Sequence, residues 1–184
     1  MQHDYELKIC WTAFPLHPDT PDEGLTIEEL FAGRPVDLTQ MRTRLKQAAH
    51  EAGLPLGERR KTYNSRLAQE LGKWAASQGK EEEFHNTMFR AYFVDGKNIG
   101  KVPVLVGLVK SLNLPGEMAQ KVLETRAFKE VVDADWAHSR AVGVTAVPTF
   151  SMNQRAIVGA QPYEILERLM RINNVRKRTP LPRE

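Results

Sequence analysis

The stretch that decides the fold is Gly-Val-Thr-Ala-Val-Pro-Thr-Phe at residues 143–150. From residue 144 to residue 152 most side chains are β-branched or aromatic, which is typical of a strand. An Asn-Gln pair then predicts a turn, and residues 155–159 predict a second short strand, so we expect a β-hairpin. Pro148 is unusual there, because proline removes a backbone donor from a strand. A cis peptide bond would be one reason for it, although only ~5–6% of X–Pro bonds in folded proteins are cis.

The segments on either side of the hairpin complete the order of elements. Pro162 opens an amphipathic helix that ends near Ile172. At the amino end, apolar and polar side chains alternate over residues 5–12, the period-2 pattern of a strand. Three prolines within residues 14–21 then predict a loop, and residues 26–143 predict about six helices. The expected order is strand, helical block, strand, strand, helix.

Local signals support the helical block. Thr26 and Glu29 have the spacing of a capping box, which begins a helix. Three glutamates at residues 81–83 favour another helix start, because the positive end of the helix dipole attracts negative charge. Gly53 follows a stripe of apolar residues at the place where a left-handed cap residue is expected. The apolar stripes of the block are Leu38, Met41, Leu45, Ala48 and Ala49, then Leu67, Leu71, Trp74 and Ala75, then Phe84, Met88, Phe89, Tyr92 and Phe93, then Leu105, Leu108, Val109 and Leu112, then Ala119, Val122 and Leu123, and finally Phe128, Val131, Val132 and Val142.

Composition and charge exclude several classes of protein. The chain has 184 residues, of which 41% are apolar and 27% charged, as in soluble globular domains. Residues 171–184 hold five Lys or Arg residues and one Glu, so they account for the net charge of +3, and the rest of the chain is close to neutral. Such a basic end is most often solvated, so we expect neither nucleic acid nor a membrane as a partner. The first residues lack the pattern of a secretion signal and no run is long enough for a membrane span, so we expect a cytoplasmic protein.

Cys10 is the only cysteine. One cysteine excludes an internal disulfide, a Cys-x-x-Cys redox pair and a zinc site built mainly on thiolates within this chain. A lone cysteine is most often a small packed hydrophobe, so a redox role for Cys10 is the lesser alternative. The five histidines show no spacing typical of metal ligands, and we predict no metal site.

Several stretches together resemble the DsbA family of thioredoxin-fold thiol-disulfide oxidoreductases, and most of all its FrnE-like branch. The similarity rests first on residues 143–150 and on Gly-Ala-Gln-Pro at residues 159–162. It extends to Trp-Thr-Ala-Phe-Pro-Leu-His-Pro at residues 11–18, to Asn-Ser-Arg-Leu-Ala at residues 64–68, and to residues 78–93. These stretches follow the family's order over nearly the whole chain. The resemblance implies a thioredoxin-like sheet that carries a helical insertion.

The resemblance also implies a substrate site. In the family, the residue before the cis-proline offers its backbone N–H and C=O to an extended substrate, which is a form of β-strand addition. This assigns Val147, Pro148 and Thr149 to substrate binding. The Cys-x-x-Cys helix that carries the family's chemistry has no counterpart here, and Cys10 matches the strand that follows that helix. We therefore expect no catalytic residue in this chain.

The absent first strand has a structural consequence. In the family it lies between the counterparts of residues 5–12 and 147–150, so two strand edges would be unpaired without it. Each buried backbone group without a partner costs ~1–3 kcal/mol. The natural protein could therefore start upstream of Met1, the two strands could close up directly, or they could pair with another chain, for example in a homodimer.

We predict an α/β fold of the thioredoxin-like, DsbA-like type whose first βα unit is absent. Residues 1–18 and 143–172 would form the incomplete thioredoxin-like domain, residues 19–142 a helical insertion, and residues 173–184 a basic, flexible tail. The family's activity is protein thiol-disulfide oxidoreduction on dithiol or disulfide proteins and peptides, but we expect this chain to be redox-inactive. One alternative is a glutathione-dependent isomerase or transferase of the hydroxychromene-carboxylate isomerase or kappa type, and glutathione is then the only cofactor we expect. The other alternative is a non-catalytic peptide-binding module.

Overall fold

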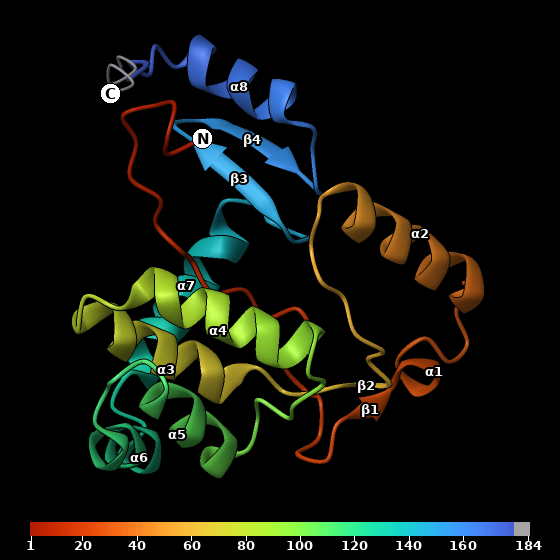
Figure 1. Ribbon diagram of the computed structural model, residues 1–184, viewed down its shortest axis with the longest axis vertical. Helices are drawn as coiled ribbons and strands as arrows, with labels where there is room; N and C mark the ends of the chain where they lie inside the picture. Colours follow the sequence, from red (N-terminus) through yellow and green to blue (C-terminus); the bar gives the residue numbers. More distant parts are fainter. Residues whose placement is uncertain (179–184) are drawn as a thin grey trace. The chain divides into compact units, whose positions relative to one another are not determined.

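The computed structural model describes residues 1–178, and residues 179–184 lie outside the described part (Figure 1). The chain divides into two compact units. One unit consists of Met1–Leu16 and the chain from Asp135 onward, and the other is His17–Ala134. The predicted α/β class is confirmed, because the described residues form eight helices and two small antiparallel sheets. No helix within the described range is long and apolar enough to span a membrane.

The unit His17–Ala134 is mostly helical and holds a two-stranded ribbon in which Leu25 lies opposite Thr62. Where the sequence predicts about six helices between residues 26 and 143, the structure has seven, the last of which crosses the boundary between the units. In chain order these elements are β1 (Leu25–Thr26), α1 (Ile27–Leu30), α2 (Leu38–Glu51), β2 (Lys61–Thr62), α3 (Arg66–Ser77), α4 (Glu81–Phe93), α5 (Val102–Lys110), α6 (Gly116–Thr125) and α7 (Lys129–Ala141).

The predicted capping box is confirmed at the start of α1. The Glu29 backbone N–H donates to the Thr26 hydroxyl at 3.1 Å, and the Thr26 N–H donates to the Glu29 carboxylate at 2.7 Å. The Asn64 side chain has a similar role before α3, because its carbonyl oxygen accepts from the Arg66 N–H at 2.9 Å. These bonds satisfy backbone donors that would otherwise lack a partner at helix starts.

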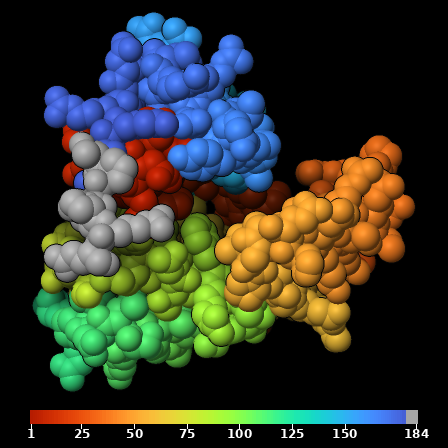
Figure 2. Space-filling model, turned by 45° about the horizontal axis from the view of Figure 1, so that its top comes forward, coloured from red at the N-terminus to blue at the C-terminus, as the bar shows by residue number. Residues whose placement is uncertain are grey.

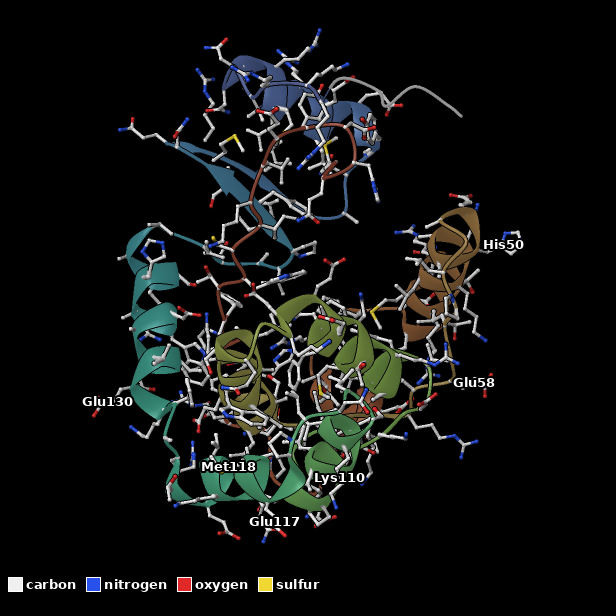
Figure 3. The ribbon with its side chains drawn as sticks, turned by 60° about the vertical axis from the view of Figure 1, so that its left-hand side comes forward. His50, Glu58, Lys110, Glu117, Met118 and Glu130 are labelled. Carbon is white, nitrogen blue, oxygen red and sulfur yellow. The ribbon has the colours of Figure 1, made fainter. Side chains whose placement is uncertain are left out.

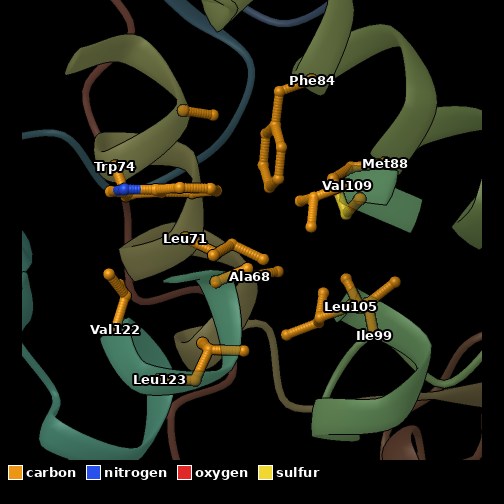
Figure 4. Close-up of a cluster of buried hydrophobic side chains, with 12 residues drawn as sticks. Ala68, Leu71, Trp74, Phe84, Met88, Ile99, Leu105, Val109, Val122 and Leu123 are labelled. Carbon is orange, nitrogen blue, oxygen red and sulfur yellow. The ribbon is translucent and has the colours of Figure 1, made fainter. Parts of the chain in front are cut away.

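Helices α3 to α6 enclose the hydrophobic core of this unit (Figure 4). Gly72 allows α4 to come close to α3, since a Cβ at that position would lie 3.1 Å from the Phe84 ring. The predicted stripes of these helices supply most of the core, and each fully buried aliphatic or aromatic side chain stabilises the fold by about 1.5–3 kcal/mol. The buried members are Ala68, Leu71, Trp74, Ala75, Phe84, Met88, Ile99, Leu105, Val109, Ala119, Val122 and Leu123.

Helix α2 differs from the others because none of its residues is buried. Leu45, at the centre of its apolar stripe, is 50% exposed. Figure 2 shows this helix in orange with its side chains on the surface, and Figure 3 labels the exposed His50 in its last turn. An ion pair of 2.5 Å joins Arg42 to Glu28. The stripe that the sequence shows is therefore a surface feature of α2.

A buried carboxylate on α3 connects this helix to the end of α6 and, through Arg66, to α7. Glu70 on α3 is 1% exposed and accepts from Arg126 at 2.7 and 2.8 Å and from Arg66 at 2.5 Å. Arg66 also pairs with Asp133 of α7 at 2.7 Å. Burial alone would raise the pKa of the Glu70 carboxyl, but the hydrogen bonds from Arg126 and Arg66 outweigh burial and hold this pKa below its ordinary value of 4.5.

The other unit is built on the predicted hairpin. Strands β3 (Thr149–Met152) and β4 (Arg155–Val158) pair antiparallel, with Phe150 opposite Ile157. The two-residue turn between them begins at Asn153, whose φ of 53° is tolerated by asparagine better than by most residues. Helix α8 (Tyr163–Ile172) follows, with Pro162 as its N-cap rather than its first helical residue. The hairpin prediction is confirmed, although residues 144–148 form a loop and not a strand.

The prediction of a strand over residues 5–12 is wrong. Only Tyr5 forms a β-bridge, with Lys177, and the rest of the segment is irregular. In the described residues β3 pairs with β4 alone, so the two strand segments do not close up. Ile9 and Trp11 are 41% and 42% exposed. An alternating pattern forms a strand only beside another strand, and within residues 1–178 none lies beside this segment.

Side chains of α7 hold the end of this segment instead. The Ala13 N–H donates to the Asp135 carboxylate at 2.7 Å, and the Ser139 hydroxyl donates to the Ala13 carbonyl oxygen at 3.3 Å. These bonds give the backbone at Ala13 the partners that a neighbouring strand would supply. The segment 6–15 is thus positioned without belonging to a sheet.

The tail predicted over residues 173–184 is described as far as residue 178, and this part has contacts with the rest of its unit; residues 179–184 lie outside the described part. The Glu6 N–H donates to the Arg176 carbonyl oxygen at 2.9 Å, and Lys177 pairs with Glu167 at 2.9 Å. Tyr5, which is 1% exposed, packs with Leu169 and Met170 of α8 beside these contacts. Arg176 and Lys177 therefore have partners at the amino end and on α8. Composition alone does not show such contacts between distant residues.

Glu70→Gln should lower the free energy of unfolding by about 3 kcal/mol at pH 7. This is the lower end of what removing one partner of a buried ion pair costs, because Arg126 stays partly exposed. Urea unfolding followed by tryptophan fluorescence measures it, with Glu83→Gln, which breaks the exposed pair with Lys80, as the control. The pKa of the Glu70 carboxyl is lower in the folded chain than in the unfolded chain. The difference in unfolding free energy between the parent and Glu70→Gln should therefore shrink as the pH falls below about 4.5. Equal stability of the two variants at pH 7 would contradict the role of Glu70.

Candidate functional site

The cis-proline loop (residues 144–148) lies directly before β3. Its last peptide bond, between Val147 and Pro148, is cis. The Gly159 N–H donates to the Pro148 carbonyl oxygen at 2.7 Å. The Thr149 hydroxyl donates to the carbonyl oxygen three residues earlier, also at 2.7 Å. These two hydrogen bonds hold the loop at the mouth of the hairpin, and a third, from the Val144 N–H to the Ser139 carbonyl oxygen at 2.9 Å, holds its start to α7.

The register of the hairpin decides which backbone groups of β3 face away from β4. Antiparallel neighbours alternate between pairs that exchange hydrogen bonds and pairs that do not. The bond from Gly159 to Pro148 marks a bonded pair, so the next pair, Thr149 and Val158, is not bonded. Ser151 lies two residues further and has the same orientation. The N–H and C=O groups of Thr149 and Ser151 therefore point away from β4.

Val147 continues this row of backbone groups. It is 44% exposed, and among the described residues neither its N–H nor its C=O has a hydrogen-bond partner. We call the backbone of Val147, Thr149 and Ser151 the inner edge. Phe150 on the same strand is 39% exposed and adds an apolar side chain. Free donors and acceptors at alternate residues are what an extended peptide needs in order to add as a strand.

Three of the predicted site residues lie together. Val147, Pro148 and Thr149 are consecutive at the mouth of the hairpin, and the backbone of Val147 and of Thr149 belongs to the inner edge. The Thr149 hydroxyl is already engaged within the loop, so its side chain has a positioning role. The sequence reasoning missed Ser151. Its place follows from the position of the turn, because the register fixes the alternation along β3.

Cys10 does not join this group. It is exposed and free, and it lies in the irregular segment 6–15 rather than on a strand. No hydrogen bond within the described part of the chain connects it to the cis-proline loop. Within residues 1–178 no three metal-binding side chains gather either. The arrangement offers backbone hydrogen bonds and apolar contacts, without a dithiol.

Comparisons with known proteins identify the family of this chain. The sequence model of the DSBA-like thioredoxin domain matches residues 1–171. The protein YwbO of Bacillus subtilis (strain 168) is 31% identical over 103 residues, which are 55% of this chain. The match spans about half of YwbO, 52% of its length.

Solved structures show the same fold. A probable DsbA oxidoreductase, SCO1869 of Streptomyces coelicolor, superposes with a TM-score of 0.81 at 24% identity over 94% of this chain and 77% of its own. A 2-hydroxychromene-2-carboxylate isomerase superposes with a TM-score of 0.66 at 21% identity over 74% of this chain and 69% of its own. The cytosolic disulfide reductase DsbM of Pseudomonas aeruginosa, solved with GSH, gives 0.54 at 23% identity over 75% and 79%. The match over residues 1–171 shows that the chain belongs to the DSBA-like thioredoxin domain family.

Proposed function

We propose that this DsbA-like chain binds extended peptide segments along the inner edge and does not itself exchange disulfides. The observation that carries the proposal is the row of backbone groups at Val147, Thr149 and Ser151 that lack partners in the described residues. An unpaired edge recruits an extended chain through main-chain hydrogen bonds, and neighbouring side chains then select the sequence. The exposed side chains of Val147 and Phe150 favour an apolar residue in the bound segment.

The redox part of the proposal rests on the count of cysteines. Thiol-disulfide oxidoreduction in the DsbA family uses a nucleophilic thiolate and a second thiol that resolves the mixed disulfide. This chain has one cysteine, Cys10, which is exposed and has no partner thiol. The 184-residue chain can therefore bind a client of such an enzyme without completing the exchange.

A glutathione-dependent activity is the second candidate. It is favoured by the similarity to a disulfide reductase solved with GSH and to 2-hydroxychromene-2-carboxylate isomerase. Glutathione is a short peptide, so its main-chain groups could pair with Val147 as a longer segment would. A rise in melting temperature with millimolar glutathione, lost in Val147→Pro, would favour this candidate over a peptide client.

The finer assignments belong to the same proposal. We assign the chain to the FrnE-like branch, residues 19–142 to a helical insertion, of which unit His17–Ala134 holds the larger part, and the chain's place of action to the cytoplasm. The resemblance of residues 11–18 and 64–68 supports the branch, and the cytosolic DsbM among the similar structures supports the location. An unpaired inner edge also suits a homodimer, which light scattering on the purified chain would detect.

The 184-residue chain should show no turnover in the reduction of insulin disulfides by dithiothreitol. The rate should equal the rate without protein, because no second thiol is present to release the client. Cys10→Ser serves as the matched variant and should give the same rate. Turnover that is lost in Cys10→Ser would contradict the proposal and assign the activity to Cys10.

Val147→Pro should weaken binding of an extended peptide about 3- to 10-fold. Proline deletes one backbone donor of the inner edge, which is worth about 0.5–1.5 kcal/mol. The probe is fluorescein-labelled insulin B chain with alkylated thiols, and fluorescence anisotropy gives its Kd. Val147→Ala removes the side chain and keeps the donor, so it should bind more tightly than Val147→Pro. Circular dichroism checks that both variants fold, and equal affinities of folded variants would count against the inner edge.

A further inference from the structure

The hairpin has a second open side, away from the inner edge. In Figure 1, helix α8 runs along β4, and a groove of about 450 Å³ lies between these two elements. Its size falls in the range of about 300–1,000 Å³ typical of ligand sites. It shares no residue with the cis-proline loop or the inner edge. We call it the β4–α8 groove.

One wall of the groove is an unpaired strand edge. Because Arg155 and Ile157 face β3 in bonded pairs, the residues between and after them, Ala156 and Val158, direct their N–H and C=O groups outward. The Val158 carbonyl oxygen accepts from the Gln161 side chain at 2.9 Å, so the outward groups without a partner in the described residues are the N–H and C=O of Ala156 and the N–H of Val158. In the described residues β4 has no strand on this side. An extended chain can therefore add to β4 here as it can to β3 on the other side.

The floor and the opposite wall are apolar. Leu169 is 3% exposed and lies at the base, while Ile165 and Ile172 are 39% and 45% exposed. These two isoleucines are seven residues apart on α8, so they sit about 10 Å apart on one face of the helix. Three residues of an extended chain span about the same length. A bound strand could place one aliphatic side chain between them.

Two guanidinium groups flank this apolar slot. Arg155 on β4 and Arg168 on α8 are both exposed, and neither side chain has an ion-pair or hydrogen-bond partner in residues 1–178. Glu164, one helical turn before Arg168, makes no ion pair with it in this range. Glu167, the next acidic residue of α8, is engaged by Lys177 and Tyr5. The groove therefore has an excess of positive charge.

We propose that the β4–α8 groove binds an extended acidic peptide segment, with carboxylates on Arg155 and Arg168 and an aliphatic side chain between Ile165 and Ile172. Guanidinium groups recognise carboxylates through paired hydrogen bonds, which gives the segment its charge preference. A second copy of this chain fits less well, because antiparallel pairing of two β4 edges would bring like-charged arginines together.

Fluorescence anisotropy with a labelled peptide of four Glu-Val repeats tests the proposal. The same length of Lys-Val repeats is the control probe and should not bind in the groove. Arg155→Gln and Arg168→Gln should each weaken binding of the Glu-Val peptide about tenfold, because each variant loses a hydrogen bond between charged groups. Arg171→Gln changes an exposed arginine of α8 that does not line the groove, and it should bind as the parent does.

Two further variants separate the groove from the inner edge. Ala156→Pro deletes an outward N–H, which does not take part in pairing with β3, and it should weaken binding of the Glu-Val peptide. The inner edge can also hold an extended peptide with apolar residues, so Val147→Pro should weaken binding of the Glu-Val peptide less than Ala156→Pro does. The proposal is overturned if the Lys-Val peptide binds as tightly as the Glu-Val peptide, or if both arginine variants bind as the parent does. It is also overturned if Val147→Pro, but not Ala156→Pro, abolishes binding.

Discussion

The need of every backbone N–H and C=O group for a partner governs this chain. A two-stranded hairpin satisfies only the groups that its strands turn toward each other, and β3 and β4 pair with no other strand in the described residues. At Ala13 the partners of the backbone N–H and C=O groups are the side chains of Asp135 and Ser139. At Val147 the backbone N–H and C=O groups have no hydrogen-bond partner among the described residues. The candidate binding site is thus the place where the fold leaves backbone groups available.

Local chemistry made much of the fold predictable. The capping box at Thr26 and Glu29, the apolar stripes of α3 and α4, and the two-residue turn of the hairpin act over a few residues, so the sequence shows them directly. The strand expected over residues 5–12 is wrong for the opposite reason, and the contacts of residues 176–178 were not predicted. Both depend on partners far away in the chain, such as the bridge between Tyr5 and Lys177.

The site was predictable only in part, because some of its features depend on contacts between distant parts of the chain. Val147, Pro148 and Thr149 came from a resemblance to a family, whereas the orientation of their backbone groups required the register of β3 on β4. Ser151 joins the site by that register alone. The β4–α8 groove had no signal in the sequence, because Arg155 and Arg168 come together only when α8 packs along the hairpin. The buried charge of Glu70, by contrast, stabilises the helical unit and contributes no binding group.

Hydrogen–deuterium exchange of the Thr149 and Ser151 amides, resolved by NMR, tests most directly whether the inner edge is an open binding surface. Both amides should exchange rapidly in the free chain, because they point away from β4, whereas the Phe150 amide should be protected by Ile157. Addition of the alkylated insulin B chain should slow exchange at Thr149 and Ser151. Protection of both amides in the free monomer, or unchanged rapid exchange with saturating peptide, would contradict an open edge that binds extended segments.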